Sequence, residues 1–300
     1  MNLLVTGAFD CTEKELNMLC ERGHEVVFMQ QEKSPLPCEA AWVEGIIGNG
    51  IFLSHSIEQF TSLRYIQLTS AGFDRVPMDY VEQHGIEIHN ARGVYSVPMA
   101  EFAVSGVLQL YKQSRYFHEN QKAHKWEKHR GLTELYGKQV CIVGCGSVGT
   151  ECAKRFKAFG CSLVGVDIKP YKNELYDSML PLNSLDKALM QADVTVLTLP
   201  LTEVTRRLIN EDRFTAMKHG AVLVNIARGA IIDTDALIVA LNTHLRGVVL
   251  DVFDDEPLYE SCPLWDMENV IITPHNSFVS DGNHARMLDV IMNNLESAAT

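Results

Sequence analysis

A short apolar run followed by three glycines constrains the fold of this chain more than any other feature of its sequence. Residues 140–143 are all apolar, as in a strand buried on both faces of a parallel sheet. The run leads directly into Gly144-x-Gly146-x-x-Gly149, and residues 150–159 then have the pattern of an amphipathic helix that ends at a glycine. This order of strand, glycine turn and helix predicts a dinucleotide-binding Rossmann unit.

Each glycine of this motif has a physical function. Gly144 permits the tight turn, Gly146 lets a pyrophosphate approach the backbone, and Gly149 lets the helix pack closely on the strand. We expect the amides of Ser147 and Val148 to point at the phosphates, because the positive end of the helix dipole lies there. Glycine-rich turns also serve plain packing, so the motif needs a second signal.

A carboxylate supplies that signal. The next apolar run, residues 162–166, ends in Asp167, which is 18 residues beyond Gly149. A dinucleotide site has an acidic residue at this separation to accept hydrogen bonds from the adenosine ribose. The same charge repels a 2′-phosphate, so the sequence favours NAD over NADP, although Lys169 is close enough to weaken the preference. The alternative is a packing turn followed by a solvated aspartate.

The composition of the chain limits which partners it can bind and which cellular compartment suits it. A length of 300 residues predicts two domains, and a formal charge of −12 argues against nucleic acid, which requires a basic face. No apolar run is long enough to span a bilayer, and the first ten residues do not resemble a signal peptide. The eight cysteines lack the paired spacing of metal ligands, so we expect no metal and interpret them as small buried hydrophobes in a reducing cytoplasm.

Strand-like and helix-like segments alternate along the chain, which predicts parallel, doubly wound sheets. Residues 1–98 form a first domain without the dinucleotide motif, and residues 99–279 form the Rossmann domain, beginning with one long helix over 99–118. A last helix near 283–298 would pack back on the first domain, so that domain comprises 1–98 plus 280–300. Its turns at Gly48-Asn49-Gly50 and Ser70–Asp74 expose backbone amides where ligands bind, or are simply tight turns that need glycine.

Three polar residues follow late strands of the Rossmann domain, where the carboxyl ends of parallel strands meet. His275 has the side chain best suited to move a proton near neutrality, and Glu256 could fix its tautomer and favour the imidazolium. Arg228 could grip a substrate carboxylate with two hydrogen bonds. Taken singly, each residue could have no catalytic role: His275 could be a core or surface histidine, Glu256 a solvated acid and Arg228 an ion-pair partner.

The order of several segments resembles the D-isomer-specific 2-hydroxyacid dehydrogenases over nearly the whole chain. These segments are Ser70-Ala-Gly72-Phe-Asp74, Ala100-Glu101, Gly137-Lys138, Pro200-Leu-Thr202 with Thr205, Asn225-Ile-Ala-Arg228-Gly229, Leu250-Asp251-Val-Phe253 with Glu256-Pro257, and Pro263-Leu-Trp265 with Asn269 to His275. The resemblance implies a Rossmann NAD-binding domain inserted in a flavodoxin-like substrate domain.

The resemblance also implies roles for individual residues. His275 would be the general acid/base, Glu256 its partner and Arg228 the substrate anchor. The implied cofactor contacts are Pro200, Thr205, Ile226, Ala227, Arg228 and Asp251, and the implied substrate contacts are Asn49, Gly50, Gly72 and Arg228. Similar enzymes form homodimers through the nucleotide domain, using the segment near residues 100–130. Two positions depart from the family pattern: Thr198 stands where many relatives have histidine, and Asn276-Ser277 replaces a small apolar pair.

The sequence therefore predicts a cytoplasmic NAD-dependent oxidoreductase acting on a 2-hydroxy acid and 2-oxo acid pair. Two alternatives stay open. One is a nucleotide-sensing scaffold of the same fold without turnover, which would have no need of a general acid. The other is an NADPH-preferring reductase of the glyoxylate or hydroxypyruvate type, which rests on Lys169 alone.

Overall fold

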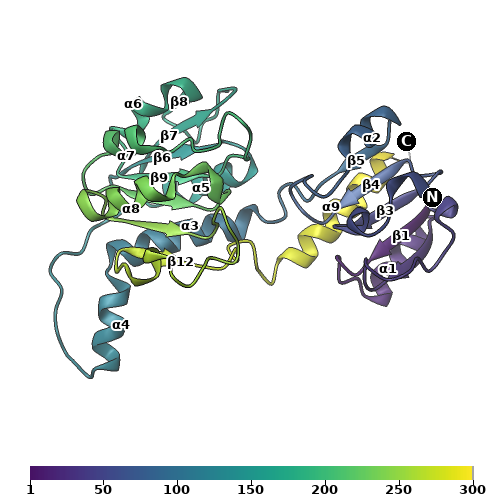
Figure 1. The fold of residues 1–300 in the computed structure, drawn as a ribbon, viewed down its shortest axis with the longest axis horizontal. Helices are drawn as coiled ribbons and strands as arrows, with labels where there is room; N and C mark the ends of the chain where they lie inside the picture. Colours follow the sequence, from purple (N-terminus) through teal and green to yellow (C-terminus); the bar gives the residue numbers. More distant parts are fainter. Residues whose placement is uncertain (299–300) are drawn as a thin grey trace. The chain divides into compact units, whose positions relative to one another are not determined.

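The computed structural model describes residues 1–298, and the chain divides into two compact units (Figure 1). Unit 1 consists of Met1–Tyr95 and the residues from Ser280 onward, and unit 2 of Ser96–Val279. Each unit contains one sheet whose paired strands are parallel. The predicted fold class, two parallel-sheet α/β domains, is therefore confirmed.

Unit 1 has a five-stranded sheet in the order β2-β1-β3-β4-β5, which is the flavodoxin-like order. Its strands are β1 (Asn2–Thr6), β2 (Glu25–Met29), β3 (Gly45–Gly48), β4 (Tyr65–Leu68) and β5 (Glu87–His89). Its helices are α1 (Glu13–Glu21), α2 (Met78–Gln83) and α9 (Asn283–Ala298), with 3-10 turns at Ala40–Trp42, Ile51–Leu53 and Ile57–Gln59.

The last helix belongs to unit 1 because of its apolar stripe. Buried side chains recur along α9 at helical spacing, and they join a core cluster with Leu3 and Val5 of β1. These side chains are Met287, Ile291, Met292 and Leu295. The stripe therefore covers one face of the sheet, while a second cluster containing Leu4 and Ile46 fills the other face.

Unit 2 has a seven-stranded sheet in the order β12-β11-β10-β9-β6-β7-β8, which is the doubly wound Rossmann order. Its strands are β6 (Gln139–Val143), β7 (Ser162–Asp167), β8 (Ser178–Pro181), β9 (Val194–Leu197), β10 (Val222–Asn225), β11 (Gly247–Leu250) and β12 (Val270–Ile272). Its helices are α3 (Ser96–Tyr111), α4 (Ser114–Lys122), α5 (Ser147–Ala158), α6 (Leu185–Leu189), α7 (Glu211–Ala216) and α8 (Thr234–Thr243), with 3-10 turns at Leu182–Ser184, Gly229–Ile231 and Pro263–Asp266.

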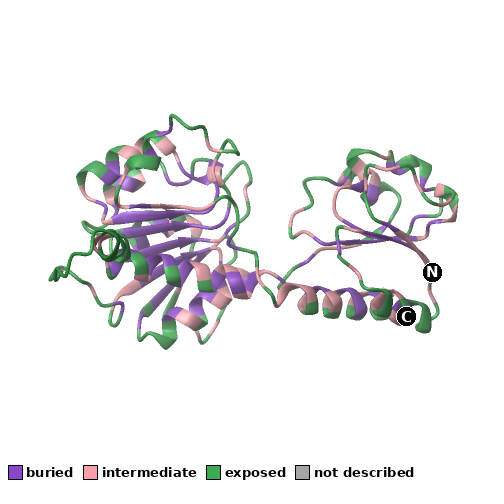
Figure 2. Ribbon diagram, turned by 90° about the horizontal axis from the view of Figure 1, so that it is seen from below, coloured by how far each residue is buried: buried purple, intermediate pink, exposed green. Residues whose placement is uncertain are grey.

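Burial explains why these strands are visible in the sequence. The central strands β9, β10 and β11 are buried along their whole length, so they read as continuous apolar runs (Figure 2). Two clusters, one on each face of the sheet, make up the core of unit 2. Among residues 1–298, no helix combines the length and the apolarity that crossing a membrane requires.

Three expectations need correction. The single helix expected over 99–118 is broken into α3 and α4, because Gln113 adopts the left-handed conformation with φ of 54°. The edge strand β8 has no counterpart among the segments expected from the sequence. Burial holds for only part of the cysteine set, since Cys20 is exposed and Cys11 and Cys38 are half-buried.

Candidate active site

The glycine turn after β6 has little room for side chains at two of its three glycines. Gly144 has φ of 96°, and a Cβ atom there would lie 2.6 Å from the amide nitrogen of Leu199. A Cβ atom on Gly149 would lie 2.1 Å from the carbonyl oxygen of Gly144. At Gly146 a Cβ atom would meet no described atom within 4 Å, so this position faces open space. The turn is tight where it packs and open where a phosphate would approach.

Hydroxyl groups hold the carbonyl oxygens of this turn. Thr198 donates to Gly144 O at 2.5 Å, and Tyr171 donates to Cys145 O at 2.6 Å. Tyr176 donates to the Gly149 carbonyl at 3.1 Å, and its burial raises the pKa of its phenol, which therefore stays protonated and able to donate. Sequence reasoning missed both tyrosines as parts of the site, since a side chain aimed at a backbone carbonyl leaves no motif.

The amides at the start of α5 complete the phosphate-type geometry. Gly146 is the N-cap residue of this 12-residue helix and, as a glycine, has no side chain with which to cap it. Ser147 and Val148 are the first two helical residues. The carboxylate of Asp167, at the end of β7, accepts from the Cys145 amide at 2.8 Å and from the Lys169 amide at 3.1 Å. The predicted acidic residue therefore lies directly beside the glycine turn, and the arrangement fits a dinucleotide.

The neighbouring cysteine is not a nucleophile. Burial raises the pKa of the Cys145 thiol to about 11, and its Sγ atom lies 3.6 Å from the carbonyl oxygen of Ile142. The thiol is therefore protonated at neutral pH, and it fills space between the turn and the sheet.

Two further predicted cofactor segments are held by their own turns. The hydroxyl of Thr205, a fully buried residue, donates to Pro200 O at 2.8 Å and accepts from the Thr202 amide at 2.7 Å. Asn225 is also fully buried, and its side chain donates to Arg228 O at 2.9 Å and accepts from the Ala227 amide at 3.1 Å. The buried Thr205 hydroxyl thus stabilises the turn that follows Pro200, and Asn225 fixes the backbone that contains Ile226 and Ala227.

Arg228 is exposed, and its Nη1 donates to the Ala227 carbonyl at 2.7 Å. The turn that carries it packs closely against the loop after β11, because a Cβ atom on Gly229 would lie 1.9 Å from the carbonyl carbon of Phe253. The same loop carries Glu256. No described contact joins the Arg228 side chain itself to Glu256 or His275.

The structure brings Glu256 and His275 together. His275 Nδ1 lies 2.8 Å from Glu256 Oε2, and Glu256 Oε1 accepts from the Phe253 amide at 3.0 Å. An ionised carboxylate can only accept, so the shared proton belongs to Nδ1 and the other ring nitrogen, Nε2, is left to exchange a proton with a ligand. The two side chains are partly exposed, at 43% for His275 and 36% for Glu256, so a ligand can reach the pair.

Asp251 positions the loop that carries His275. This aspartate is buried, with 1% of its surface exposed, and three donors surround its carboxylate. Thr273 Oγ1 lies at 2.6 Å, the Asn276 amide at 2.7 Å and the Ser277 amide at 2.9 Å. The pair Asn276-Ser277 therefore supplies backbone donors here. The loop also holds His275 at φ of 51°, a left-handed conformation that these bonds maintain.

The predicted substrate contacts of unit 1 lie on two turns. In the first, the amides of Asn49 and Gly50 donate to the carboxylate of Glu32, each at 2.7 Å. In the second, Ser70 Oγ donates to Gly72 O at 3.0 Å and stabilises the turn. Glu32 belongs to no motif, so sequence reasoning missed it.

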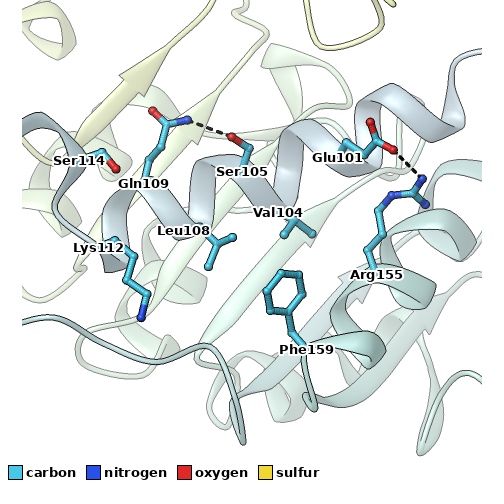
Figure 3. Close-up of a pocket in the computed structure, with 9 residues that line it drawn as sticks. All are labelled: Glu101, Val104, Ser105, Leu108, Gln109, Lys112, Ser114, Arg155 and Phe159. Atoms are coloured by element: carbon cyan, nitrogen blue, oxygen red, sulfur yellow. Dashed lines mark hydrogen bonds and ion pairs between the residues drawn. The ribbon is translucent and has the colours of Figure 1, made fainter. Parts of the chain in front are cut away.

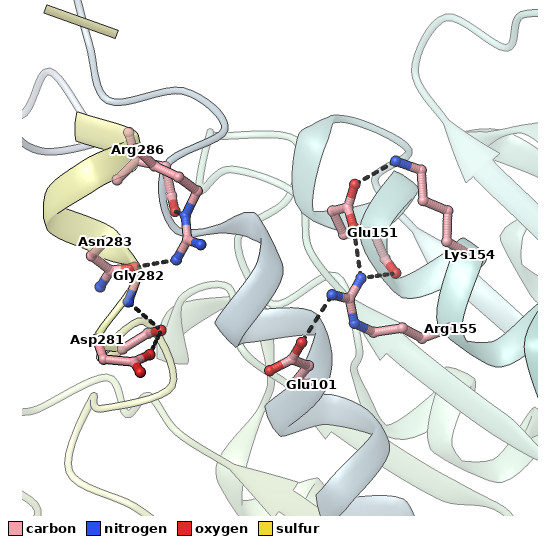
Figure 4. A network of polar contacts seen from close by, with 10 residues as sticks. Glu101, Glu151, Lys154, Arg155, Asp281, Gly282, Asn283 and Arg286 are labelled. Atoms are coloured by element: carbon pink, nitrogen blue, oxygen red, sulfur yellow. Dashed lines mark hydrogen bonds and ion pairs between the residues drawn. The ribbon is translucent and has the colours of Figure 1, made fainter. Parts of the chain in front are cut away.

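A groove in unit 2 lies away from these residues. It runs along α3 and α5, where Val104 and Leu108 face Phe159 (Figure 3). Arg155 closes one end, since its guanidinium binds Glu101 at 3.0 Å and Glu151 at 2.6 Å (Figure 4). None of the predicted site residues lines this groove.

Comparison with known proteins gives consistent matches. The family profile described as D-isomer specific 2-hydroxyacid dehydrogenase, NAD binding domain, matches residues 104–277. A glyoxylate reductase of Thermofilum pendens is 33% identical over 241 residues, which is 78% of this chain and 71% of that protein.

Two solved structures extend the likeness to both units. The TT0316 protein of Thermus thermophilus has a TM-score of 0.77 and 33% identity, covering 98% of this chain and 96% of that one. A D-lactate dehydrogenase of Aquifex aeolicus, complexed with NAD and lactic acid, has a TM-score of 0.78 and 25% identity, covering 99% and 95%.

Proposed function

Because the chain belongs to the D-isomer specific 2-hydroxyacid dehydrogenase family, we propose that it interconverts a D-2-hydroxy acid and the matching 2-oxo acid with NAD(H). One observation carries the proposal: the 2.8 Å contact between His275 Nδ1 and Glu256 Oε2, on loops that follow the adjacent strands β11 and β12. An imidazole with one nitrogen held by a carboxylate and the other presented to a ligand is suited to acid/base catalysis.

We assign the proton transfer to His275. In the direction of reduction, Nε2 gives its proton to the carbonyl oxygen of the 2-oxo acid, and Glu256 stabilises the imidazolium before transfer and keeps the tautomer correct after it. Arg228 holds the substrate carboxylate. Asp251 acts through the loop it binds, because its three hydrogen bonds keep His275 in place.

The cofactor site that we propose is the edge of unit 2 around the glycine turn. Bound NADH supplies the hydride that reaches the carbonyl carbon. The Ser147 and Val148 amides would hold its phosphates beside Gly146, and Asp167 its adenosine ribose. Pro200, Ile226 and Ala227 would contribute backbone contacts, with Thr205 shaping the turn after Pro200. Unit 1 would be the substrate domain, through Asn49, Gly50 and Gly72.

A substrate panel tests the activity. Purified protein with NADH is mixed with glyoxylate, hydroxypyruvate, pyruvate and bulkier 2-oxo acids, and loss of NADH absorbance is followed. We expect turnover of at least one, with a D-configured product. Glu256→Gln should lower kcat by about 10²-fold or more, while the exposed neighbour Asp255→Asn leaves it unchanged. Nucleotide binding without turnover on the whole panel would favour a sensing scaffold instead.

We further propose that the chain forms a homodimer through the groove on α3 and α5. Its lining includes Leu108 and Phe159, and Phe159 is 42% exposed. Apolar side chains of α4 and the segment after it, Phe117, Trp126 and Leu132, are also exposed, with Trp126 at 98%. An apolar groove together with exposed aromatic side chains is typical of a surface that a partner covers.

Sedimentation equilibrium tests this surface. We expect twice the 33.6 kDa mass of one chain for the wild type and a monomer for Leu108→Arg. The matched control is Val239→Arg, since Val239 is 63% exposed on α8, outside the groove. A monomeric wild type at micromolar concentration would contradict the proposal.

A cytoplasmic location is proposed from the eight free thiols, which suit a reducing compartment, and cell fractionation would test it.

A further inference from the structure

The carboxylate of Glu32 sits on two consecutive backbone amides in unit 1. Glu32 lies just after β2, and it reaches the turn after β3, where Oε1 accepts from the Asn49 amide and Oε2 from the Gly50 amide, both at 2.7 Å. A third donor, Thr6 Oγ1, binds Oε1 at 2.8 Å. Both carboxylate oxygens are thus held by hydrogen bonds that the charge strengthens.

The surroundings of this carboxylate are specific. Thr6 is fully buried, so its hydroxyl needs a partner, and Glu32 provides one. Gly48 leaves the necessary room, because a Cβ atom there would lie 2.7 Å from Glu32 Oε1 and 3.0 Å from Thr6 Oγ1. The Oδ1 atom of Asn49 is buried and accepts no hydrogen bond from any described residue. The turn is therefore a preformed carboxylate site with one further acceptor beside it.

Asn49 and Gly50 are proposed above as substrate contacts, and their two amides are the groups that a substrate carboxylate would bind. A backbone amide has one hydrogen, so a pair of amides that binds Glu32 through both oxygens cannot bind a second carboxylate in the same way. The Glu32 contact shows that this pair accepts a carboxylate with good geometry. It also means that a substrate carboxylate must displace one that is tethered to the chain and always present.

We propose that Glu32 is a specificity-determining residue that competes with the substrate carboxylate for the Asn49 and Gly50 amides. This inference rests on the proposed function. Glu32 raises KM for 2-oxo acids and raises the dissociation constant of unreactive carboxylates. It leaves kcat unchanged, because it takes no part in hydride or proton transfer once the substrate is bound.

Steady-state kinetics on Glu32→Gln test the competition. A neutral amide binds backbone donors more weakly than a carboxylate does, so KM for the preferred 2-oxo acid should fall about ten-fold at constant kcat. Thr6→Val removes one hydrogen bond to Glu32 and retains the shape of the side chain. The KM of this variant should therefore lie between those of the wild type and Glu32→Gln. Glu39→Gln is the matched control, an exposed glutamate on the same connection between β2 and β3.

A second readout does not depend on turnover. The amide resonances of Asn49 and Gly50 in the full ¹⁵N-labelled chain are titrated with oxamate, an unreactive analogue of a 2-oxo acid. In Glu32→Gln they should shift at about ten-fold lower oxamate concentration than in the wild type. Equal titration curves, or resonances that oxamate does not move, would overturn the role of Glu32.

The two readouts separate the two proposals. Turnover of a 2-oxo acid with unchanged KM and titration in both Glu32→Gln and Thr6→Val would sink the inference and leave the dehydrogenase function standing. If the variants bind oxamate more tightly but neither they nor the wild type turn over a 2-oxo acid, carboxylate competition would stand and the proposed reaction would be wrong.

Discussion

The two units have the same arrangement at the amino-terminal edge of their sheets. In unit 1, Glu44 precedes β3 and accepts from the amide of Asn2, the first residue of β1, at 2.8 Å. In unit 2, Asp193 precedes β9 and accepts from the amide of Gln139, the first residue of β6, at 3.0 Å. A carboxylate thus joins the first strand to its neighbour in both sheets.

The carboxyl-terminal edges differ. In unit 2, Asp167 binds one amide of the glycine turn, that of Cys145, and the 12-residue helix α5 begins at Ser147, just after the turn. In unit 1, Glu32 binds the amides of both Asn49 and Gly50 and uses both of its oxygens. The doubly wound fold preserves one edge of the sheet for stability, whereas loop residues at the other edge decide what each unit binds.

The largest expected effect tests whether unit 2 alone supplies the acid/base chemistry. Replacing His275 by alanine should lower kcat by about 10²- to 10⁴-fold, because the proton donor to the carbonyl oxygen is removed. NADH affinity, measured by fluorescence titration, should not change. His219→Ala is the control, an exposed histidine outside the site. Undiminished turnover in His275→Ala would show that His275 of unit 2 is not the proton donor.

The glycine turn allows packing and binding to be separated with two similar substitutions. Gly149→Ala should lower the free energy of unfolding by about 2 kcal/mol, since the added Cβ atom would lie 2.1 Å from Gly144 O. Gly146→Ala faces open space, so it should leave stability unchanged and weaken NADH binding. Urea unfolding and NADH titration of both variants check this, and tight NADH binding by Gly146→Ala would contradict the assignment.

The shared amino-terminal edge predicts a matched pH dependence of stability. Burial alone would raise the pKa of Asp193, but hydrogen bonds from Lys218 and the Gln139 amide lower it below the ordinary value of 3.8. The bond from the Asn2 amide is the main reason that the pKa of Glu44 is also lowered. Since the folded pKa values are depressed, these carboxylates stabilise the protein above the unfolded pKa values, and that contribution is lost as the pH falls through the folded values.

We therefore expect Asp193→Asn to cost about 1–2 kcal/mol at pH 7 and Glu44→Gln about 1 kcal/mol, because the Glu44 side chain is more exposed, at 31% against 17%. Urea unfolding at pH 7 and below pH 4 measures both. The difference from wild type should shrink at the lower pH. A cost that does not change with pH would show that the ionised carboxylates are not the cause.

The last prediction concerns the choice of cofactor. Asp167→Asn keeps an acceptor for the Cys145 amide but loses the charge, so the ratio of NADPH to NADH affinity should rise about ten-fold. Lys169→Ala should move the ratio slightly the other way. Titration of each protein with both nucleotides measures it, and an unchanged ratio in Asp167→Asn would leave the preference unexplained.

The sequence was sufficient for most of the fold, because buried parallel strands read as continuous apolar runs. It failed where tertiary packing decides. Residues 178–181, which form β8, are partly exposed at the sheet edge and end in Pro181, so no apolar run marks them. The break between α3 and α4 occurs at Gln113, a residue with a side chain where glycine would normally signal the left-handed conformation.

The site divides in the same way. Arg228, Glu256 and His275 could be proposed from sequence because chemically active side chains follow three strands of one sheet, and their roles stay predictions. Glu32 and Tyr171 could not be found, because each binds a backbone group. Such a partner exists only after the chain has folded, and several polar residue types can provide it.

The membership of α9 in unit 1 has a consequence for how the chain is synthesised. On a ribosome, β1 emerges first, but part of the core cluster around Leu3 and Val5 comes from residues near Ile291, after all of unit 2. Unit 2 is continuous in sequence and can complete its sheet first. Until α9 is made, this apolar face of the first strands is therefore covered only in part, by residues such as Leu19 of α1, and a chain released before residue 283 would lack the contribution of α9.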